Sequence, residues 1–152
     1  MITPIQAKQV PRALLLLADP DWSKVQQALE QATVYGYQLA GKIVGVLVLQ
    51  PQTATVKEIT IVAVVPSYQH QGIARALLQT VIKSCQQDTT CEQLQIGTGN
   101  SSLRQLALYQ HAGFEMVSVW VDYFVDNYPE PIYENGLQCK SMVRLALNVK
   151  AG

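Results

Sequence analysis

The sequence predicts an α/β fold in which one sheet carries helices on both faces. Short β-branched runs with strand character alternate along the chain with segments whose apolar residues recur at helical spacing. No repeat, low-complexity segment or linker interrupts the 152 residues. This length suits one domain with its own core, so residues 1–152 are expected to form a single domain. The mixed order of strands and helices is typical of a sheet that is covered on both sides.

Seven strands are expected, each a short run rich in β-branched residues and bounded by turn residues. They cover residues 2–6, 34–39, 42–50, 59–65, 93–98, 114–122 and 139–149. Ala40-Gly41 and Asn135-Gly136 are interpreted as turns. Residues 43–49 are almost all apolar, which predicts a strand buried on both faces. Residues 123–136 are expected to form a long loop or a broken strand.

Four helices are expected between these strands. They cover residues 7–18, 22–32, 73–85 and 102–111. Pro11 lies near the first turn of the first helix, where proline is tolerated. Asp21 or Ser23 is expected to cap the second helix, and Ser101 or Ser102 the fourth. Gly113 is expected to end the fourth helix.

The segment from Glu58 to Asp88 is central to the prediction. Its β-branched strand is ended by Pro66, which has no N–H for a sheet ladder, and a helix begins after Gly72. The first N–H groups of a helix have no intrahelical partner, and the macrodipole is positive there, so this junction suits an anion. An ordinary strand-to-helix turn is the alternative. Neither a Walker loop nor a dinucleotide glycine triplet is present.

Composition excludes several classes of protein. A formal net charge of zero argues against nonspecific nucleic-acid binding. Two histidines, and three cysteines without metal-ligand spacing, make a metal site improbable and favour reduced thiols in a cytoplasmic protein. The longest apolar run near the N-terminus, residues 13–18, is too short to cross a membrane.

Two blocks resemble a known family. Residues 64–74, VVPSYQHQGIA, closely resemble the acetyl-CoA loop of the GCN5-related N-acetyltransferases (GNAT), whose pattern is [QR]-x-x-G-x-[GA]. Asn100 followed by residues 108–114, LYQHAGF, is similar to the second block of that family. The resemblance implies a mixed, mostly antiparallel sheet of about seven strands, splayed between the fourth and fifth. It also implies acetyl-CoA as co-substrate.

The resemblance further implies which residues hold the cofactor. The turn and helix start would bind the pyrophosphate through backbone N–H groups, and the fourth strand would pair with the pantetheine arm, with the Val64 N–H polarising the thioester carbonyl. The cofactor-binding residues expected on this basis are Val62, Ala63, Val64, Gln69, His70, Gln71, Gly72, Ile73, Ala74, Arg75 and Asn100. Arg75 is expected either to pair with a phosphate or simply to be solvated. Asn100 is expected to bond the cofactor arm, and the alternative is that it is only a cap or turn residue.

Two residues are the catalytic candidates. Tyr109 would protonate the leaving thiolate, because a phenol and a thiol differ in acidity by only about two units; the alternative is a core tyrosine on an apolar helix. Glu58 matches the general base of the histone-acetylating branch, or else is a solvated strand-end residue. Period-two alternation predicts Glu58, Thr60, Val62 and Val64 on one face. Gln95 stands where the N-terminal-acetylating branch has a glutamate, which counts against that branch.

The acceptor is the least determined part. The stretch from Asp122 to Glu134 is acidic and aromatic. Such a stretch suits a cationic amine through cation–π contact; the alternative is a loop that is merely solvated. Trp22 contributes to the acceptor site or only packs. Cys139 is expected to be a packing residue. Exposed apolar strands near the C-terminus would allow a homodimer.

These observations favour an acetyl-CoA-dependent N-acetyltransferase that acts on a small-molecule or peptide amine by direct attack in a ternary complex, with no nucleic-acid or membrane partner. A non-catalytic acyl-CoA-binding or regulatory module is the main alternative. An interaction protein that kept only the fold is the third.

Overall fold

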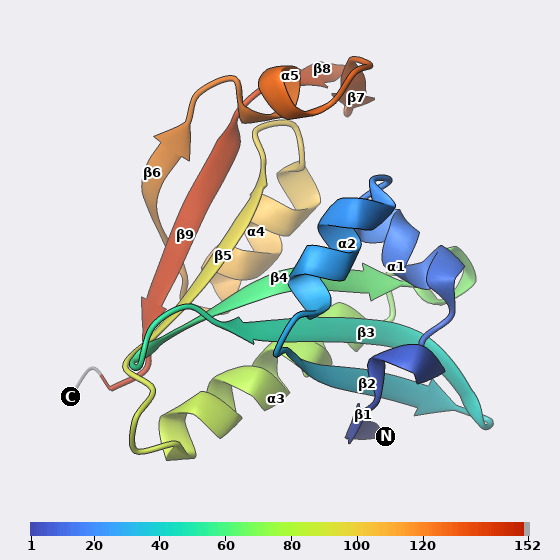
Figure 1. Ribbon diagram of the computed structural model, residues 1–152, viewed down its shortest axis with the longest axis vertical. Helices are drawn as coiled ribbons and strands as arrows, with labels where there is room; N and C mark the ends of the chain where they lie inside the picture. The colour runs from blue at the N-terminus through green and yellow to red at the C-terminus, as the bar shows by residue number, and fades with distance from the viewer. Residues whose placement is uncertain (151–152) are drawn as a thin grey trace. The chain divides into compact units, whose positions relative to one another are not determined.

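The computed structural model describes residues 1–150 (Figure 1). The described residues divide into two compact units, Met1–Leu94 with Val149 and Lys150, and Gln95–Asn148. Its main sheet has seven strands and the pairings are mostly antiparallel. This confirms the expected α/β class and strand number. The splay expected between the fourth and fifth strands stays a prediction.

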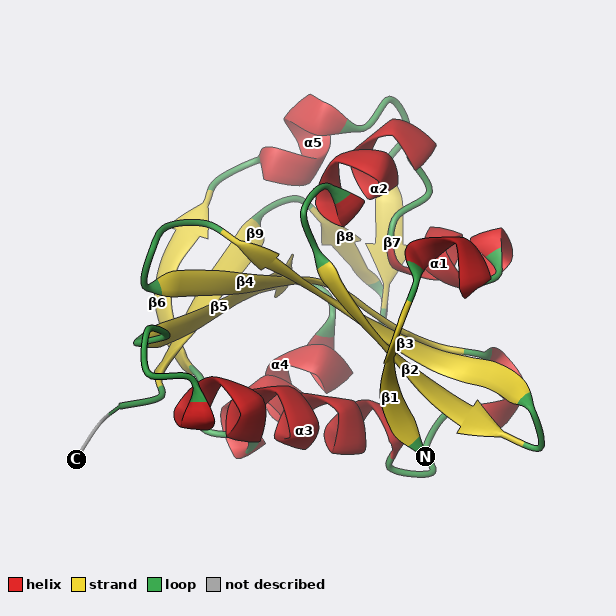
Figure 2. Ribbon diagram, turned by 60° about the horizontal axis from the view of Figure 1, so that its bottom comes forward, coloured by secondary structure: helices red, strands yellow, loops and turns green. Residues whose placement is uncertain are grey.

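The first unit is built on four antiparallel strands in the order β1-β2-β3-β4. Their bounds are β1 Ile2–Ile5, β2 Thr33–Leu39, β3 Lys42–Pro51 and β4 Val56–Val64. The helical segments are η1 Ala7–Gln9, α1 Arg12–Ala18, α2 Trp22–Leu29, η2 Pro66–Tyr68 and α3 Ile73–Gln87. In Figure 2, α1 and α2 lie on one face of these strands and α3 lies on the other.

The core of this unit shows why helices pack on both faces of its four strands. Residues 44–49 of β3 are all buried, as the sequence predicts for this strand. Alternate β3 side chains join the cluster beneath α1 and α2, which consists of Val10, Leu14, Leu15, Val25, Val34, Val46, Val48, Ile61 and Ala63. On the other face, a Cβ added to Gly45 would lie 2.7 Å from Ile73 Cγ2 and 3.3 Å from Leu77 Cδ1. The absence of a side chain at Gly45 therefore lets α3 approach β3 closely.

The expected single helix over residues 7–18 is wrong. The structure has the short η1, and α1 begins only after Pro11. Proline restricts the residue before it to extended conformations and cannot donate to a preceding carbonyl, so one continuous helix cannot form across Pro11. The cap expected at Asp21 is confirmed: its Oδ1 accepts the N–H groups of Ser23 (3.0 Å) and Lys24 (3.4 Å).

The second unit contains strands in the order β5-β9-β6 and a separate β7-β8 hairpin. The bounds are β5 Gln93–Gly99, α4 Leu103–His111, β6 Glu115–Trp120, α5 Tyr123–Asn127, β7 Ile132–Glu134, β8 Leu137–Cys139 and β9 Met142–Asn148. The turn expected at Asn135-Gly136 joins β7 to β8, with both residues at positive φ. The last strand, expected over residues 139–149, is β9, which begins only at Met142 because the ladder is broken between β8 and β9.

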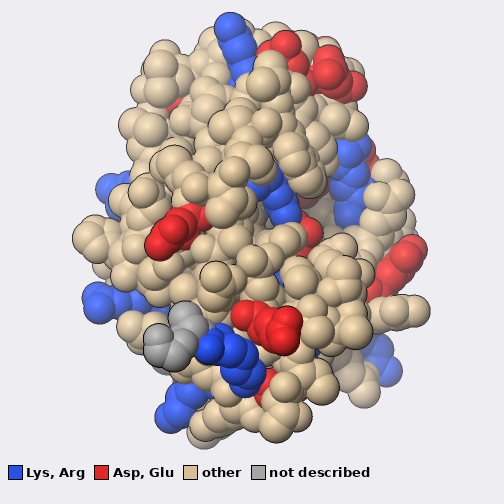
Figure 3. Space-filling model, turned by 90° about the vertical axis from the view of Figure 1, so that its left-hand side faces the viewer, with Lys and Arg blue, Asp and Glu red and all other residues tan. Residues whose placement is uncertain are grey.

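The edge strand β6 is exposed along its whole length. Its apolar side chains include Met116 (52% exposed), Val117 (62%) and Val119 (53%). Figure 3 shows charged side chains of both signs dispersed among uncharged surface on the face that it presents. The homodimer that the sequence allows stays a prediction.

Candidate functional site

The junction between β4 and α3 has the geometry of an anion-binding turn. After Val64 the chain passes through η2, and then His70 and Gly72 adopt left-handed conformations with φ of 65° and 83°. The side chain of Gln69 donates to the Val64 carbonyl (2.9 Å), which ties the turn back to the end of β4. Glycine adopts this conformation without steric cost, and α3 begins at the next residue.

The N-terminus of α3 fits a diphosphate. Gly72 occupies the cap position and has no side chain with which to cap the helix. A Cβ added to Gly72 would have no heavy atom of another part of the chain within 4 Å, so the space beside it is open. The first turn contains Ile73, which is buried beneath the helix, together with the half-buried Ala74 and the exposed Arg75. Amides at the positive end of a 15-residue helix suit the binding of a phosphate group.

The backbone of β4 divides its hydrogen-bonding groups between two sides. Val65 N–H donates to Val44 O (2.8 Å), and the ladder alternates from this bond through the pairs Val64↔Gly45 and Ala63↔Val46. Groups of Ala63 therefore point toward β3, whereas those of Val62 and Val64 point away from it. Only the latter two have the backbone orientation needed to pair with a pantetheine arm.

Glu58 does not lie where simple alternation predicts. Val48 is opposite Ile61 and Leu49 is opposite Ile59, so Thr60 is an extra residue in β4, a β-bulge. From Ile59 back to the start of β4, each side chain lies on the opposite face from the one that uninterrupted alternation predicts. Glu58 is opposite Gln50, and residues opposite each other share a face.

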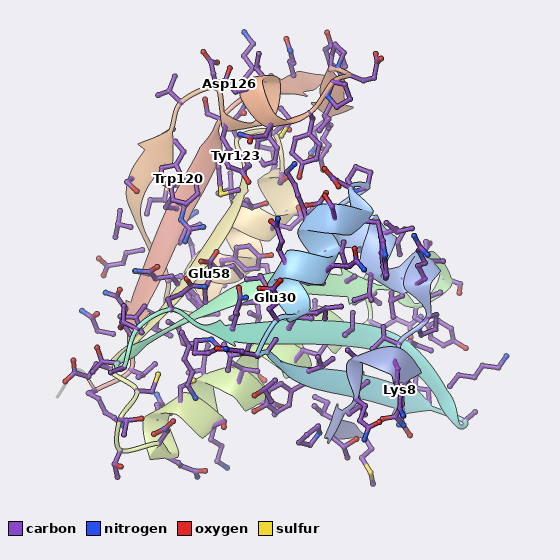
Figure 4. All side chains as sticks on the ribbon, in the orientation of Figure 1. Lys8, Glu30, Glu58, Trp120, Tyr123 and Asp126 are labelled. Atoms are coloured by element: carbon purple, nitrogen blue, oxygen red, sulfur yellow. The ribbon has the colours of Figure 1, made fainter. Side chains whose placement is uncertain are left out.

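The face of Glu58 follows from the contacts of Gln50. The Gln50 side chain donates to the carbonyls of Gln27 (2.9 Å) and Glu30 (3.1 Å) at the end of α2. Glu58 is therefore on the α1–α2 face with Ile61, and the prediction that it shares a face with Val62 and Val64 is wrong. Figure 4 shows Glu58 on β4 and Glu30 at the end of α2. Sequence reasoning missed Gln50, because no local pattern distinguishes it from a solvated strand-end residue.

In the second unit, Tyr109 is a buried residue of α4 with 5% of its surface exposed. Its ring contacts Phe114 edge-on, with the centroids 6.4 Å apart. Burial raises the pKa of Tyr109 above its usual value, because the charged phenolate loses hydration. The hydroxyl therefore keeps its proton at neutral pH, as a proton donor must.

Asn100 is a structural clamp within the second unit. Its Oδ1 accepts the backbone N–H groups of Lys140 (2.8 Å) and Ser141 (2.9 Å), and its Nδ2 donates to Gln138 O (3.1 Å). These bonds replace ladder bonds at the break between β8 and β9. They engage both lone-pair directions of Oδ1 and one of the two amide hydrogens, so one hydrogen remains for another partner.

A second polar cluster ties the β7-β8 hairpin to the start of α4. Ser102 occupies the helix cap position but does not cap; its hydroxyl donates to Glu134 Oε1 (2.9 Å). Asn135 donates to Ser101 O (2.8 Å). Cys139 is buried beside these groups, and burial raises the pKa of its thiol. A thiol of this kind is mostly protonated, which suits a packing residue better than a nucleophile.

The acidic, aromatic stretch forms a chain of ring contacts. Trp120 and Tyr123 have centroids 5.7 Å apart, Tyr123 meets Phe124 edge-on at 5.2 Å, and Phe124 stacks on Tyr128 at 5.8 Å. Figure 4 shows Trp120, Tyr123 and Asp126 around the connection from β6 to α5. The Arg144 guanidinium lies 4.4 Å from the Trp120 ring centroid, so one cation–π contact already exists here.

The structure thus groups the sequence-predicted residues in two sets. Glu58, the β4 residues 62–64 and the turn residues 69–75 belong to the first unit, and Asn100 and Tyr109 belong to the second. Within residues 1–150, no cluster of three or more His, Cys, Asp or Glu side chains could hold a metal ion. None of the helices described has both the length and the apolarity to span a membrane.

Comparisons with known proteins agree with this geometry. The sequence model of the Acetyltransferase (GNAT) family matches residues 8–114. The uncharacterized N-acetyltransferase YvbK of Bacillus subtilis is 40% identical over 139 residues, 90% of this chain and 87% of that protein.

Two solved structures are similar over 97% of both chains. A GNAT family acetyltransferase from Elizabethkingia anophelis with acetyl-CoA bound is 40% identical, with a TM-score of 0.91. A Bacillus subtilis acetyltransferase in complex with CoA is 36% identical, with a TM-score of 0.87. From the family match and these identities we conclude that the chain belongs to the GNAT acetyltransferase family.

Proposed function

We propose that this protein transfers an acetyl group from acetyl-CoA to a primary amine, by direct attack in a ternary complex. The observation that carries the proposal is the glycine-led N-terminus of α3, in a chain 40% identical to a relative with acetyl-CoA bound. Residues 1–152 act as one catalytic domain in this proposal. Its three free thiols, Cys85, Cys91 and Cys139, fit a reducing cytoplasm.

Holding the donor is the task of the first unit. Backbone N–H groups from His70 to Arg75 bind the diphosphate, and the backbone of Val62 and Val64 pairs with the pantetheine arm. The bound co-substrate supplies a thioester, whose carbon accepts the amine as its sulfur leaves. The Val64 N–H polarises the thioester carbonyl, because its orientation away from β3 leaves it directed at a ligand on that side.

Two side chains carry the proton transfers in this proposal. Glu58 accepts a proton from the attacking amine through a water molecule, which leaves a neutral nucleophile. Tyr109 gives its hydroxyl proton to the sulfur as the C–S bond breaks, and regains a proton from solvent. Burial raises the pKa of the phenol, so Tyr109 holds its proton at neutral pH before the C–S bond breaks.

The test of Tyr109 separates chemistry from binding. We expect Tyr109→Phe to lower turnover by about 100-fold or more, the usual contribution of a general acid, while acetyl-CoA affinity measured by calorimetry stays the same. Tyr133→Phe is the matched control, since Tyr133 is 67% exposed in the same unit. Unchanged turnover in Tyr109→Phe would remove the proposed role.

The test of Glu58 uses pH. Glu58→Gln should reduce the rate most at low pH, where most of the acceptor amine is protonated and the base matters most. Glu92→Gln, an exposed residue of the same unit, is the control. A rate ratio that stays flat across pH would point to another base.

A panel of amines with detection of the released thiol distinguishes the enzyme from its main alternative. Release of CoA with at least one amine supports the transferase. A protein whose melting temperature rises with acetyl-CoA, but which releases no thiol with any amine, would instead be a binding module.

A further inference from the structure

A hollow of about 470 Å³ lies among η1, α1 and α2, and the function proposed above does not use it. Its size falls in the range of small-molecule sites. Its lining includes neither Glu58 nor any residue of the turn after β4. Leu15 and Leu29 are among its apolar lining residues, so a hydrocarbon chain could lie against them.

The residues lining the hollow carry charges of both signs from different elements. Lys8 on η1 and Arg12 at the start of α1 supply two cations, and Glu30 at the end of α2 supplies an anion. Figure 4 shows Lys8 and Glu30 on these separate elements. Among the described residues, none of the three forms an ion pair, whereas the nearby Lys24 is engaged by Asp21 at 2.9 Å. Separate charges beside apolar lining residues are suited to a ligand that is charged at both ends.

Arg12 lies against the ring of Trp22. Its guanidinium carbon lies 4.0 Å from the centroid of the Trp22 ring. Arginine can hold a carboxylate with two bonds through the N–H groups in the plane of its guanidinium. The cation–π contact with Trp22 favours a position of Arg12 beside the hollow.

We propose that this hollow binds a small zwitterion with an apolar middle, of the chemical class of the ω-amino acids. The carboxylate lies on Arg12 and Lys8, the hydrocarbon chain lies against Leu15 and Leu29, and the ammonium lies at Glu30. Both ends of the ligand are recognised by groups that otherwise lack a charged partner.

Three probes of equal chain length test the proposal on the full-length protein by titration calorimetry. They are 6-aminohexanoate, hexanoate, which lacks the ammonium, and hexylamine, which lacks the carboxylate. We expect 6-aminohexanoate to bind about tenfold more tightly than either analogue, the change expected for losing one charge-assisted contact. Equal or weaker binding of 6-aminohexanoate would overturn the proposal.

Two variants locate the ends of the ligand. R12Q should weaken 6-aminohexanoate and hexanoate about tenfold and leave hexylamine unchanged, whereas E30Q should weaken 6-aminohexanoate and hexylamine and leave hexanoate unchanged. K42Q and E92Q change the same charges at exposed positions outside the hollow and should change none of the three. Melting curves and acetyl-CoA titrations check folding. If R12Q and E30Q bind all probes as their controls do, the site is elsewhere and the inference fails.

Discussion

Replacing Asn100 by alanine is the most direct test of how the second unit is held together. The side chain makes three hydrogen bonds to one backbone segment: it accepts from the N–H groups of Lys140 and Ser141 and donates to the carbonyl of Gln138. The segment has no ladder at this point, because β8 ends at Cys139 and β9 begins at Met142. Asn100→Ala would remove all three bonds at once.

The expected loss of stability follows from the three bonds. Each contributes on the order of 1 kcal/mol net, so the sum is about 3 kcal/mol. For a domain of this size, a loss of 1 kcal/mol lowers the melting temperature by roughly 2–4 °C, and the variant should melt about 6–12 °C below the natural protein. Urea unfolding should show the same loss with an unchanged dependence on denaturant.

Local measurements decide whether the bonds themselves are responsible. Hydrogen exchange of the Lys140 and Ser141 amides should accelerate in Asn100→Ala more than exchange elsewhere in the unit. The control is Asn127→Ala, because Asn127 is exposed and its amide bonds to Tyr123 O within one helical turn (2.7 Å). If Asn100→Ala destabilises no more than Asn127→Ala, or the two amides exchange as before, the clamp interpretation is refuted. A large rise in the KM for acetyl-CoA with stability preserved would favour the cofactor-arm role instead.

Three further predictions concern the first unit and Tyr109. Gly45→Ala should cost about 1–3 kcal/mol by forcing α3 away from β3, and should weaken acetyl-CoA binding in calorimetry; intact binding would separate the α3 N-terminus from the cofactor site. Hydrogen bonds from Lys24 and Ser23 lower the pKa of Asp21 from 3.8 to about 2, so the advantage of the natural protein over Asp21→Asn should hold above pH 4 and disappear as the pH falls toward 2. A melting-temperature difference that is constant across this range would contradict it. Because burial raises the pKa of Tyr109, its contribution to stability is complete below the unfolded value of about 10 and is lost above it. Unfolding measured from pH 8 to 11 should therefore show Tyr109→Phe losing less stability at alkaline pH than the natural protein.

Local chemistry made much of the fold predictable. A capping aspartate at residue 21, an Asn-Gly turn at residue 135 and an apolar run at residues 43–49 each act within a few residues, so the sequence alone predicts them. The break at Pro11 is local as well, but other misplaced features depend on partners that are distant in the sequence. The hydrogen bonds of Asn100 reach about 40 residues along the chain, and no spacing rule indicates them.

The candidate site was predictable in a similar way. The turn after β4 was expected from its glycine and from the family pattern, and the structure has a left-handed Gly72 and a helix start there. The face of the sheet on which Glu58 lies was not predictable, because the β-bulge at Thr60 depends on how β3 pairs with β4. Gln50 was missed for the same reason, since only the fold brings it to the end of α2.

The extra residue in β4 shifts the phase of the strand by half a period. Upstream of Thr60 the strand presents to α1 and α2 the side chains that an uninterrupted strand would present to α3. A strand with the same residues but no bulge would keep its register from Ile61 onward, yet would place Ile59 instead of Glu58 opposite Gln50, in front of α2. The bulge therefore decides which chemical group lies on this face while the pairing from Ile61 onward stays the same.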